Sequence, residues 1–246
     1  VPTYPIANLV PVAASVDFQK YPKAGDPNPK PRLGFAEVVT AKTVWLDRLA
    51  EYIPRFEWLD ANRLAGQLLN RAQTELELII ADAATGRSQT VLHERDPHWV
   101  NLADDLKFLK QAEEFLWTSE RTGFRHIYVY KLDGTLARTL TRGDWEVRGI
   151  SGVDEANGWV YFTASARSPL ELDLYRVALA GGVPERLSDP PGTHFITMNP
   201  NATAYADTYS TLTSVPVISV HDIASKRSTL VHSARAVDAY ALVKPG

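Results

Sequence analysis

The chain of 246 residues contains no cysteine. This absence excludes disulfide cross-links, catalysis by a thiolate and metal sites with cysteine ligands. No apolar run approaches the roughly 18 residues that a membrane-spanning helix needs, so we expect no membrane span. An excess of one charge is also lacking, because 26 Lys and Arg stand against 29 Asp and Glu, for a net charge of −3. Without a basic patch, the sequence gives no sign of a nucleic-acid partner.

The sequence also lacks a catalytic constellation. A serine hydrolase presents its nucleophile in a Gly-x-Ser-x-Gly turn between a strand and a helix. The nearest approach, residues 149–153, ends in valine instead of glycine, and we interpret Ser151 as a turn residue. His93 and His98 are five residues apart with Pro97 between them, so one helix cannot direct both at a metal ion. We therefore expect no catalytic residue, no metal and no organic cofactor in this chain.

What the sequence does contain is a repeat. Four times, an apolar strand runs through a short polar turn into a second apolar strand, in residues 64–82, 115–132, 159–179 and 203–222. The expected turn residues Arg71, Arg121 and Arg167 are separated by 50 and 46 residues, and Ser210 follows 43 residues later. β-Branched and aromatic residues dominate each copy, as is typical of strands. Small sheets that repeat at this interval and stack around an axis are typical of β-propeller blades.

The repeat predicts an all-β fold, a β-propeller fragment of about four to five blades. We interpret residues 1–246 as one partial propeller domain, in which 1–30 form an extended connection and a partial blade and 31–246 form consecutive blades. Leucines at helical spacing occur in residues 101–117 and could indicate a helix. The place of this segment in the repeat instead favours a strand that spans residues 106–110. The recurring arginines could bind a substrate carboxylate. Because these arginines recur with the fold, ion pairs between blades or turn contacts are the favoured interpretation. Most tryptophans also lie at strand positions of the repeat, so we interpret them as residues that pack the blades.

A series of short motifs follows the repeat along the chain. They are YPKAG (21–25), NP (28–29), RFEW (55–58), LNRAQ (69–73), WVNL (99–102), TSER (118–121), GFRH (123–126), GDWEV (143–147), VDE (153–155), YF (161–162), SPLE (168–171), LY (174–175) and PGTH (191–194). In content, order and spacing, this series resembles the N-terminal propeller domain of the dipeptidyl peptidase IV family, in the prolyl oligopeptidase superfamily of serine peptidases. The resemblance covers roughly residues 18 to 225.

The resemblance implies the architecture and activity of a larger enzyme. Members of the family place an eight-bladed propeller over an α/β-hydrolase domain and release dipeptides from peptide N-termini, with proline or alanine preferred at the second position. Their Ser-Asp-His triad lies in the hydrolase domain, which we expect after residue 246, and their paired glutamates precede the motif at 21–25. Glu113 and Glu114 are not that pair, and we interpret them as a turn. The chain is then a non-catalytic, substrate-gating domain that is inactive alone.

The resemblance also indicates which segment lies nearest to a substrate. In animal members, the connection that corresponds to residues 99–105 sends an aromatic residue and an arginine into the substrate pocket. Here the connection contains Asn101-Leu102-Ala103-Asp104-Asp105, without that pair. The candidate substrate-proximal residues are Trp99, Asn101, Asp104 and Asp105.

Partners and location follow from the same resemblance. We expect peptide substrates and an α/β-hydrolase domain as partners, and the bacterial cytoplasm or periplasm as the compartment of the parent protein. Because a partial propeller leaves blade faces and strand edges uncovered, we also expect self-association. Two alternatives stay open: a free-standing propeller that binds proteins or other ligands, and another hydrolase of the superfamily with a different specificity.

Overall fold

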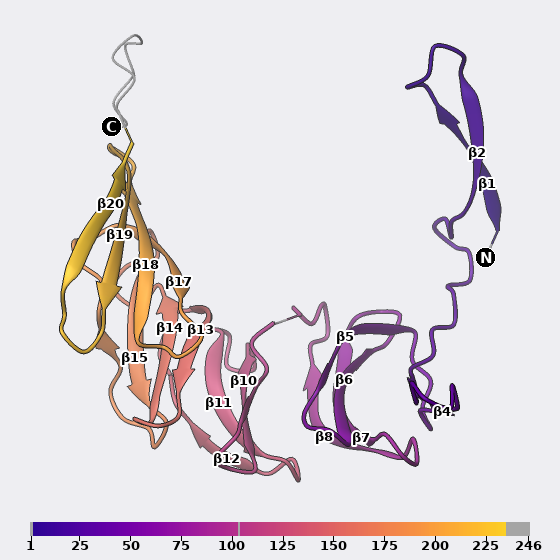
Figure 1. Cartoon of the computed structure of the whole chain (residues 1–246), viewed down its shortest axis with the longest axis horizontal. Coiled ribbons are helices and arrows are strands. Elements are labelled where there is room, and N and C mark those ends of the chain that lie inside the picture. The colour runs from indigo at the N-terminus through magenta and orange to yellow at the C-terminus, as the bar shows by residue number, and fades with distance from the viewer. Residues whose placement is uncertain (1, 103, 235–246) are drawn as a thin grey trace. The chain divides into compact units, whose positions relative to one another are not determined.

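The computed structural model describes residues 2–102 and 104–234, and its regular elements are all β-strands (Figure 1). Twenty strands in these residues form six sheets, of which four have four strands and two have two strands. Strands that are neighbours in a sheet are also neighbours in the sequence, and they pair antiparallel. No helix that could cross a membrane occurs in the described part of the chain. The prediction of an all-β fold is confirmed.

The four-stranded sheets follow one another along the chain, and we call them blades 1 to 4. Blade 1 contains β5 (Tyr52–Trp58), β6 (Arg63–Leu69), β7 (Glu75–Asp82) and β8 (Ser88–Arg95). Blade 2 contains β9 (Lys107–Leu109), β10 (Glu114–Ser119), β11 (His126–Lys131) and β12 (Leu136–Thr139). Blade 3 contains β13 (Val147–Asp154), β14 (Trp159–Ala164), β15 (Asp173–Ala178) and β16 (Glu185–Arg186). Blade 4 contains β17 (Thr193–Met198), β18 (Ala204–Thr211), β19 (Ser214–Asp222) and β20 (Ser228–Ser233).

Two hairpins precede the blades. The first pairs β1 (Thr3–Asn8) with β2 (Ser15–Lys20), and the second pairs β3 (Gly34–Ala36) with β4 (Thr43–Trp45). Most residues of the first hairpin are exposed, whereas Phe35 of the second is buried against blade 1. The predicted division of the chain between residues 30 and 31 stays a prediction.

The repeat corresponds to the two middle strands of each blade, which are β6–β7, β10–β11, β14–β15 and β18–β19. In blades 2 and 3 these strands are buried on both faces, as in β11, where five successive side chains are buried. Continuous apolar runs such as Ile127–Tyr130 are the sequence signature of this double burial. The predicted strand at residues 106–110 is confirmed as β9.

Three sequence interpretations are wrong in detail. Ser210 lies inside β18, and the turn follows at residues 212–213. Ser151 lies inside β13. Glu113 is in a turn as expected, but Glu114 is the first residue of β10. The three misplaced residues are only partly buried, so their polar side chains fit into a strand without the cost of full desolvation.

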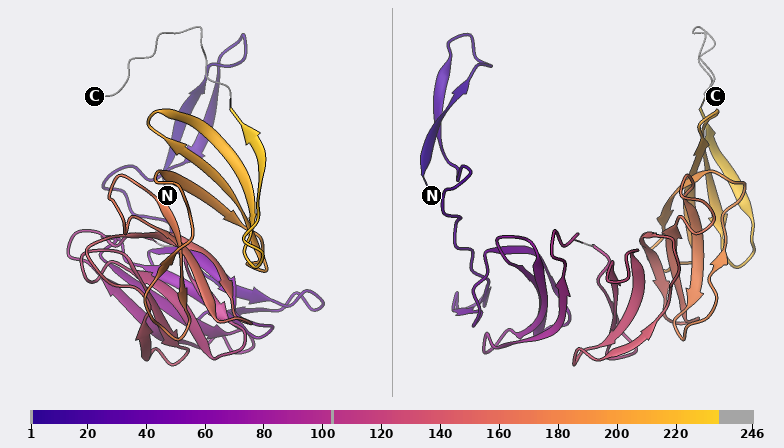
Figure 2. Two further views of the ribbon diagram at one scale, coloured as in Figure 1. Left: turned by 90° about the vertical axis from the view of Figure 1, so that its left-hand side faces the viewer. Right: turned by 180° about the vertical axis from the view of Figure 1, so that it is seen from behind.

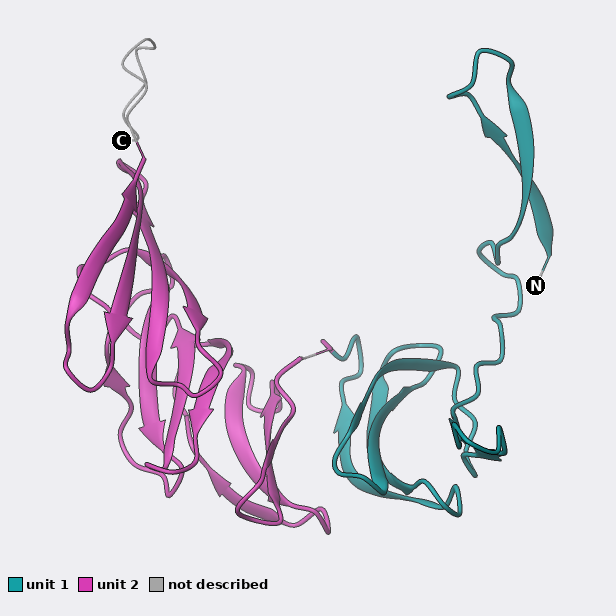
Figure 3. Cartoon of the chain, in the orientation of Figure 1, with its two compact units in different colours: residues 1–100 teal, residues 101–246 magenta. Residues whose placement is uncertain are grey.

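The chain divides into two compact units, the first ending at Val100 and the second beginning at Asn101 (Figure 3). Unit 1 holds both hairpins and blade 1, and unit 2 holds blades 2 to 4. Within unit 2, each blade lies against the next (Figure 2), with one apolar cluster between blades 2 and 3 and another between blades 3 and 4. In the first cluster, the rings of Trp145, Phe162 and Tyr175 stack with centroids 5.7 to 6.5 Å apart. Stacked four-stranded sheets of this kind are propeller blades.

Candidate functional site

A cleft of about 660 Å3 lies in unit 2, between the first strand of blade 3, β13, and the first strand of blade 4, β17. Its polar lining is Arg148, Ser151, Thr163, His194, Thr197 and Thr208, and its apolar lining includes Ile150, Leu172, Phe195, Ile196 and Met198. Ligand sites in proteins are usually clefts of about 300–1,000 Å3 that combine apolar walls with a few polar groups. The cleft therefore has the size and the lining of a binding site.

Two β-bulges shape the wall that β13 contributes. In the pairing of β13 with β14 the register shifts twice, once at Arg148 and once at Ser151, so each is an extra residue without a partner on β14. A bulge bends its strand and redirects side chains, and bulges are common beside functional sites. Both extra residues line the cleft. Gly149 and Gly152, on either side of Ile150 and Ser151, belong to this irregular part of the strand.

Asp105, one of the predicted substrate-proximal residues, lies behind this wall. Its side chain is almost entirely buried, with 9% of the residue exposed. One carboxylate oxygen accepts a hydrogen bond from the backbone N–H of Ile150 at 2.8 Å, and the other accepts one from the Thr118 hydroxyl at 3.0 Å. Asp105 thus holds β13 in place between its two bulges. It shapes the cleft without being one of its lining residues.

The other predicted residues, unlike Asp105, are exposed. Asn101 is exposed and donates a side-chain hydrogen bond to Glu120 at 2.8 Å. Asp104 is also exposed, and Ala103 lies outside the described residues. Trp99 belongs to unit 1, where it is 52% exposed and its backbone N–H donates to Asp96 at 3.0 Å.

One lining residue of the cleft, His194, belongs to a buried ion pair on blade 4. His194 is fully buried, with Nδ1 2.7 Å from a carboxylate oxygen of Asp207 and Nε2 2.9 Å from the carbonyl oxygen of Pro190. Burial by itself lowers the pKa of His194, but the hydrogen bonds to Asp207 and Pro190 act in the opposite direction, and the net pKa is above the ordinary 6.5. Since both partners accept, the imidazolium form satisfies the site best.

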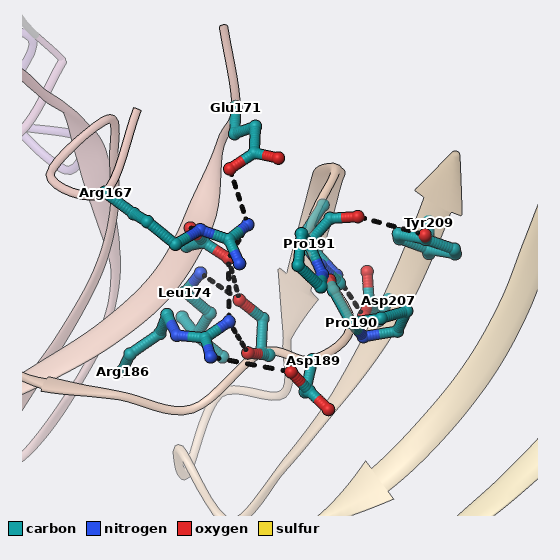
Figure 4. A network of polar contacts seen from close by, with 12 residues as sticks. Arg167, Glu171, Leu174, Arg186, Asp189, Pro190, Pro191, Asp207 and Tyr209 are labelled. Atoms are coloured by element: carbon teal, nitrogen blue, oxygen red, sulfur yellow. Dashed lines mark hydrogen bonds and ion pairs between the residues drawn. The ribbon is translucent and has the colours of Figure 1, made fainter. Parts of the chain in front are cut away.

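A second polar network lies beside this pair, where blade 3 meets the loop that leads into β17 (Figure 4). Arg167 forms ion pairs with Glu171 at 2.7 Å and with Asp173 at 3.2 Å. The Asp173 side chain is 1% exposed and also accepts a hydrogen bond from the Ser188 hydroxyl at 2.8 Å. Arg186 approaches the same carboxylate at 3.5 Å. Two arginines and a hydroxyl therefore compensate one buried carboxylate, and the network is structural.

The other recurring arginines also donate hydrogen bonds to protein groups. Arg121 donates to the Ser119 hydroxyl at 2.9 Å within blade 2, and Arg71 donates to the carbonyl oxygen of Asp26 at 2.9 Å. Arg121 and Arg167 thus contact groups of their own blade, whereas Arg71 contacts the segment between β2 and β3, and the expectation of ion pairs between blades stays a prediction.

Sequence reasoning did not identify Arg148, Thr163, His194 or Asp207 as members of one site. These residues come from four strands of two blades, and only strand pairing and blade stacking bring them together. One local signal existed, because His194 ends the PGTH motif at 191–194. In the described part of the chain, no group of three or more His, Asp or Glu side chains is placed to hold a metal ion.

Stacked blades with a cleft between their first strands define the class of the protein as a β-propeller domain. A more particular assignment comes from the family described as the dipeptidyl peptidase IV (DPP IV) N-terminal region, whose model matches residues 1–216. The chain belongs to this family. The resemblance drawn from the short motifs is confirmed.

Individual relatives agree with this assignment. A probable dipeptidyl-aminopeptidase B of Tuber melanosporum is 31% identical over 187 residues, which are 68% of this chain and 20% of that protein. Dipeptidyl peptidase 8 of Mus musculus is 27% identical over 75% of this chain and 27% of its own length. The crystal structure of Porphyromonas gingivalis dipeptidyl peptidase 4 matches with a TM-score of 0.86 and 27% identity, over 95% of this chain and 34% of that one. The chain thus spans about a fifth to a third of the proteins it resembles.

Proposed function

We propose that this chain is the non-catalytic propeller domain of a dipeptidyl peptidase IV-like serine exopeptidase and that it gates the access of peptide substrates. The observation that carries the proposal is the joint agreement of fold and sequence, with a TM-score of 0.86 to a dipeptidyl peptidase 4 and a family match over residues 1–216. In the parent enzyme, meaning the longer protein that contains this chain, an α/β-hydrolase domain supplies the Ser-Asp-His triad. The parent releases dipeptides from free N-termini, with proline or alanine preferred at the second position.

In this proposal the first strands of the blades carry the contact surface for the substrate. The cleft between β13 and β17 supports it, because hydroxyl groups can both donate to and accept from a peptide backbone. Asp105 acts indirectly by fixing the backbone of Ile150. Asn101, Asp104 and Trp99 are exposed and can meet substrate directly. The domain performs no bond cleavage, so its contribution is to position and exclude peptides.

Self-association of the chain is a further part of the proposal. β20 pairs with β19 on one side, and its residues are exposed, including Leu230 at 63% and Val231 at 62%. An exposed apolar edge strand favours pairing with another chain. Light scattering over a range of concentrations should show oligomers, and a monomer at every concentration would contradict this part.

The activity itself is tested with the full-length product of the source gene. It should hydrolyse the chromogenic substrate Gly-Pro p-nitroanilide, and replacing the elbow serine of its hydrolase domain with alanine should abolish the reaction. The 246-residue chain alone should remain at background. If the full-length protein does not hydrolyse the substrate, the peptidase proposal fails and a propeller that only binds becomes the better account.

A further inference from the structure

The cleft between β13 and β17 contains a positive charge whose role the gating function leaves unexplained. Arg148 is exposed, lines the cleft and occupies a bulge. Among the described residues, no carboxylate pairs with it. By contrast, Arg125, Arg138 and Arg167 of the same unit each have an ion-pair partner at 2.7 to 2.8 Å. A guanidinium that a bulge redirects toward a cleft, without a protein partner, is available for a ligand.

The rest of the lining favours an anionic ligand. No acidic residue lines the cleft, whereas hydroxyl groups of Ser151, Thr163 and Thr208 do. Two nearby carboxylates are already engaged. Asp105 accepts from the backbone of Ile150, and Asp207 binds the His194 ring. His194 also lines the cleft, but its charge is compensated by Asp207. In the described part of the chain, Arg148 is therefore the charged lining residue without an ion-pair partner, and hydroxyl donors stand beside it.

We propose that Arg148 binds a carboxylate group of the peptide substrate in this cleft and so makes the enzyme prefer peptides that carry one there. The inference rests on the proposed function. A planar guanidinium forms two parallel hydrogen bonds with a carboxylate, which gives this pair its strength and its directional specificity. Apolar side chains such as Phe195 and Ile196 provide contacts for the neighbouring parts of the peptide.

Two groups on a peptide have this chemistry, the side chain of Asp or Glu and the free C-terminal carboxylate. Matched peptides separate them. The first pair is Gly-Pro-Ala-Asp-Ala amide against Gly-Pro-Ala-Asn-Ala amide, which differ only in the side-chain carboxylate. The second pair is Gly-Pro-Ala-Asn-Ala with a free carboxylate against its amide, which differ only at the C-terminus.

The protein variants are Arg148→Gln, Arg148→Lys and the control Arg142→Gln, all in the full-length protein. Arg142 is exposed and outside the lining, so its replacement removes the same charge away from the cleft. The kcat/KM of dipeptide release is measured for each peptide. Equilibrium binding of the same peptides to the elbow-serine variant gives a second readout that needs no turnover.

We expect one of the two pairs to show a preference for the carboxylate of about 3- to 10-fold at low salt, as for a partly exposed charged contact. Arg148→Gln should reduce this ratio to about one, Arg148→Lys should keep part of it, and Arg142→Gln should keep all of it. Added salt should weaken the preference. The pair that responds identifies the source of the carboxylate.

A ratio near one for both pairs in the wild-type protein overturns the inference, and so does a preference that Arg148→Gln leaves unchanged. If Gly-Pro p-nitroanilide is not hydrolysed at all, the proposed function has failed instead. The binding ratios then decide whether Arg148 recognises a carboxylate, because they do not depend on catalysis.

Discussion

Replacing Asp105 with alanine removes the acceptor of two donors at the back of the cleft wall. The Ile150 N–H lies 2.8 Å and the Thr118 hydroxyl 3.0 Å from the carboxylate, whose residue is 9% exposed. A buried donor left without a partner costs about 1–3 kcal/mol. For two donors, and with some relaxation, we expect the free energy of unfolding to fall by about 2–4 kcal/mol.

Two variants test the reason for this loss. Asp105→Asn keeps an oxygen for the Ile150 N–H and an amide that can donate to the Thr118 hydroxyl, so it should cost less than about half as much as alanine. Asp144→Ala removes an exposed carboxylate and should stay within about 0.5 kcal/mol of the wild type. Urea denaturation followed by tryptophan fluorescence gives the free energies. An alanine variant as stable as the Asp144 control, or an asparagine variant as unstable as alanine, would refute the reasoning.

Three other predictions follow from the same blades. Because the pKa of His194 is raised on folding, its stabilising contribution is complete below the ordinary 6.5 and is lost as pH rises through the folded-state value. His194→Gln should therefore flatten the decline of unfolding free energy above that pH in urea titrations, and an unchanged decline would contradict this. A Cβ on Gly152 would lie 2.5 Å from Sδ of Met198, so Gly152→Ala should cost about 1–3 kcal/mol by thermal unfolding, and Met198→Ala added to it should recover part. In the parent enzyme, Asn101→Ala or Asp104→Ala should raise KM more than it lowers kcat in steady-state kinetics, because these residues position substrate without chemistry; a loss confined to kcat would contradict this.

Burial explains which parts of the fold could be predicted from the sequence. The middle strands of blades 2 and 3 are covered on both faces, so segments such as Ile127–Tyr130 are apolar without interruption and stand out. The outer strands have a weaker sequence pattern, because they are short or exposed. β16 has two residues, and β20 is exposed throughout. Ser210 and Ser151 were misplaced because small polar residues favour turns locally, and tertiary pairing overrides that preference.

The site was harder to predict than the fold because its parts meet only through tertiary structure. The resemblance points to Asp105 as a residue near the substrate, and this stays a prediction. Its role behind the cleft wall could not be predicted, because burial and a hydrogen bond to a residue 45 positions away decide it. Arg148 gave no local signal, because a bulge is a property of a strand pair and appears only when β13 is set against β14. His194 stood in a recognised motif, yet its partner Asp207 lies on the next strand.

The most direct measurement of the central claim is the product of the full-length protein acting on a peptide with a free N-terminus. Gly-Pro-Ala-Ala-Ala and its N-acetylated form are incubated with the enzyme, and the products are identified by mass spectrometry. We predict that Gly-Pro is released from the free peptide and that the acetylated peptide stays intact. An intact free peptide, or equal cleavage of both peptides, would contradict the assignment of this chain to a dipeptide-releasing peptidase.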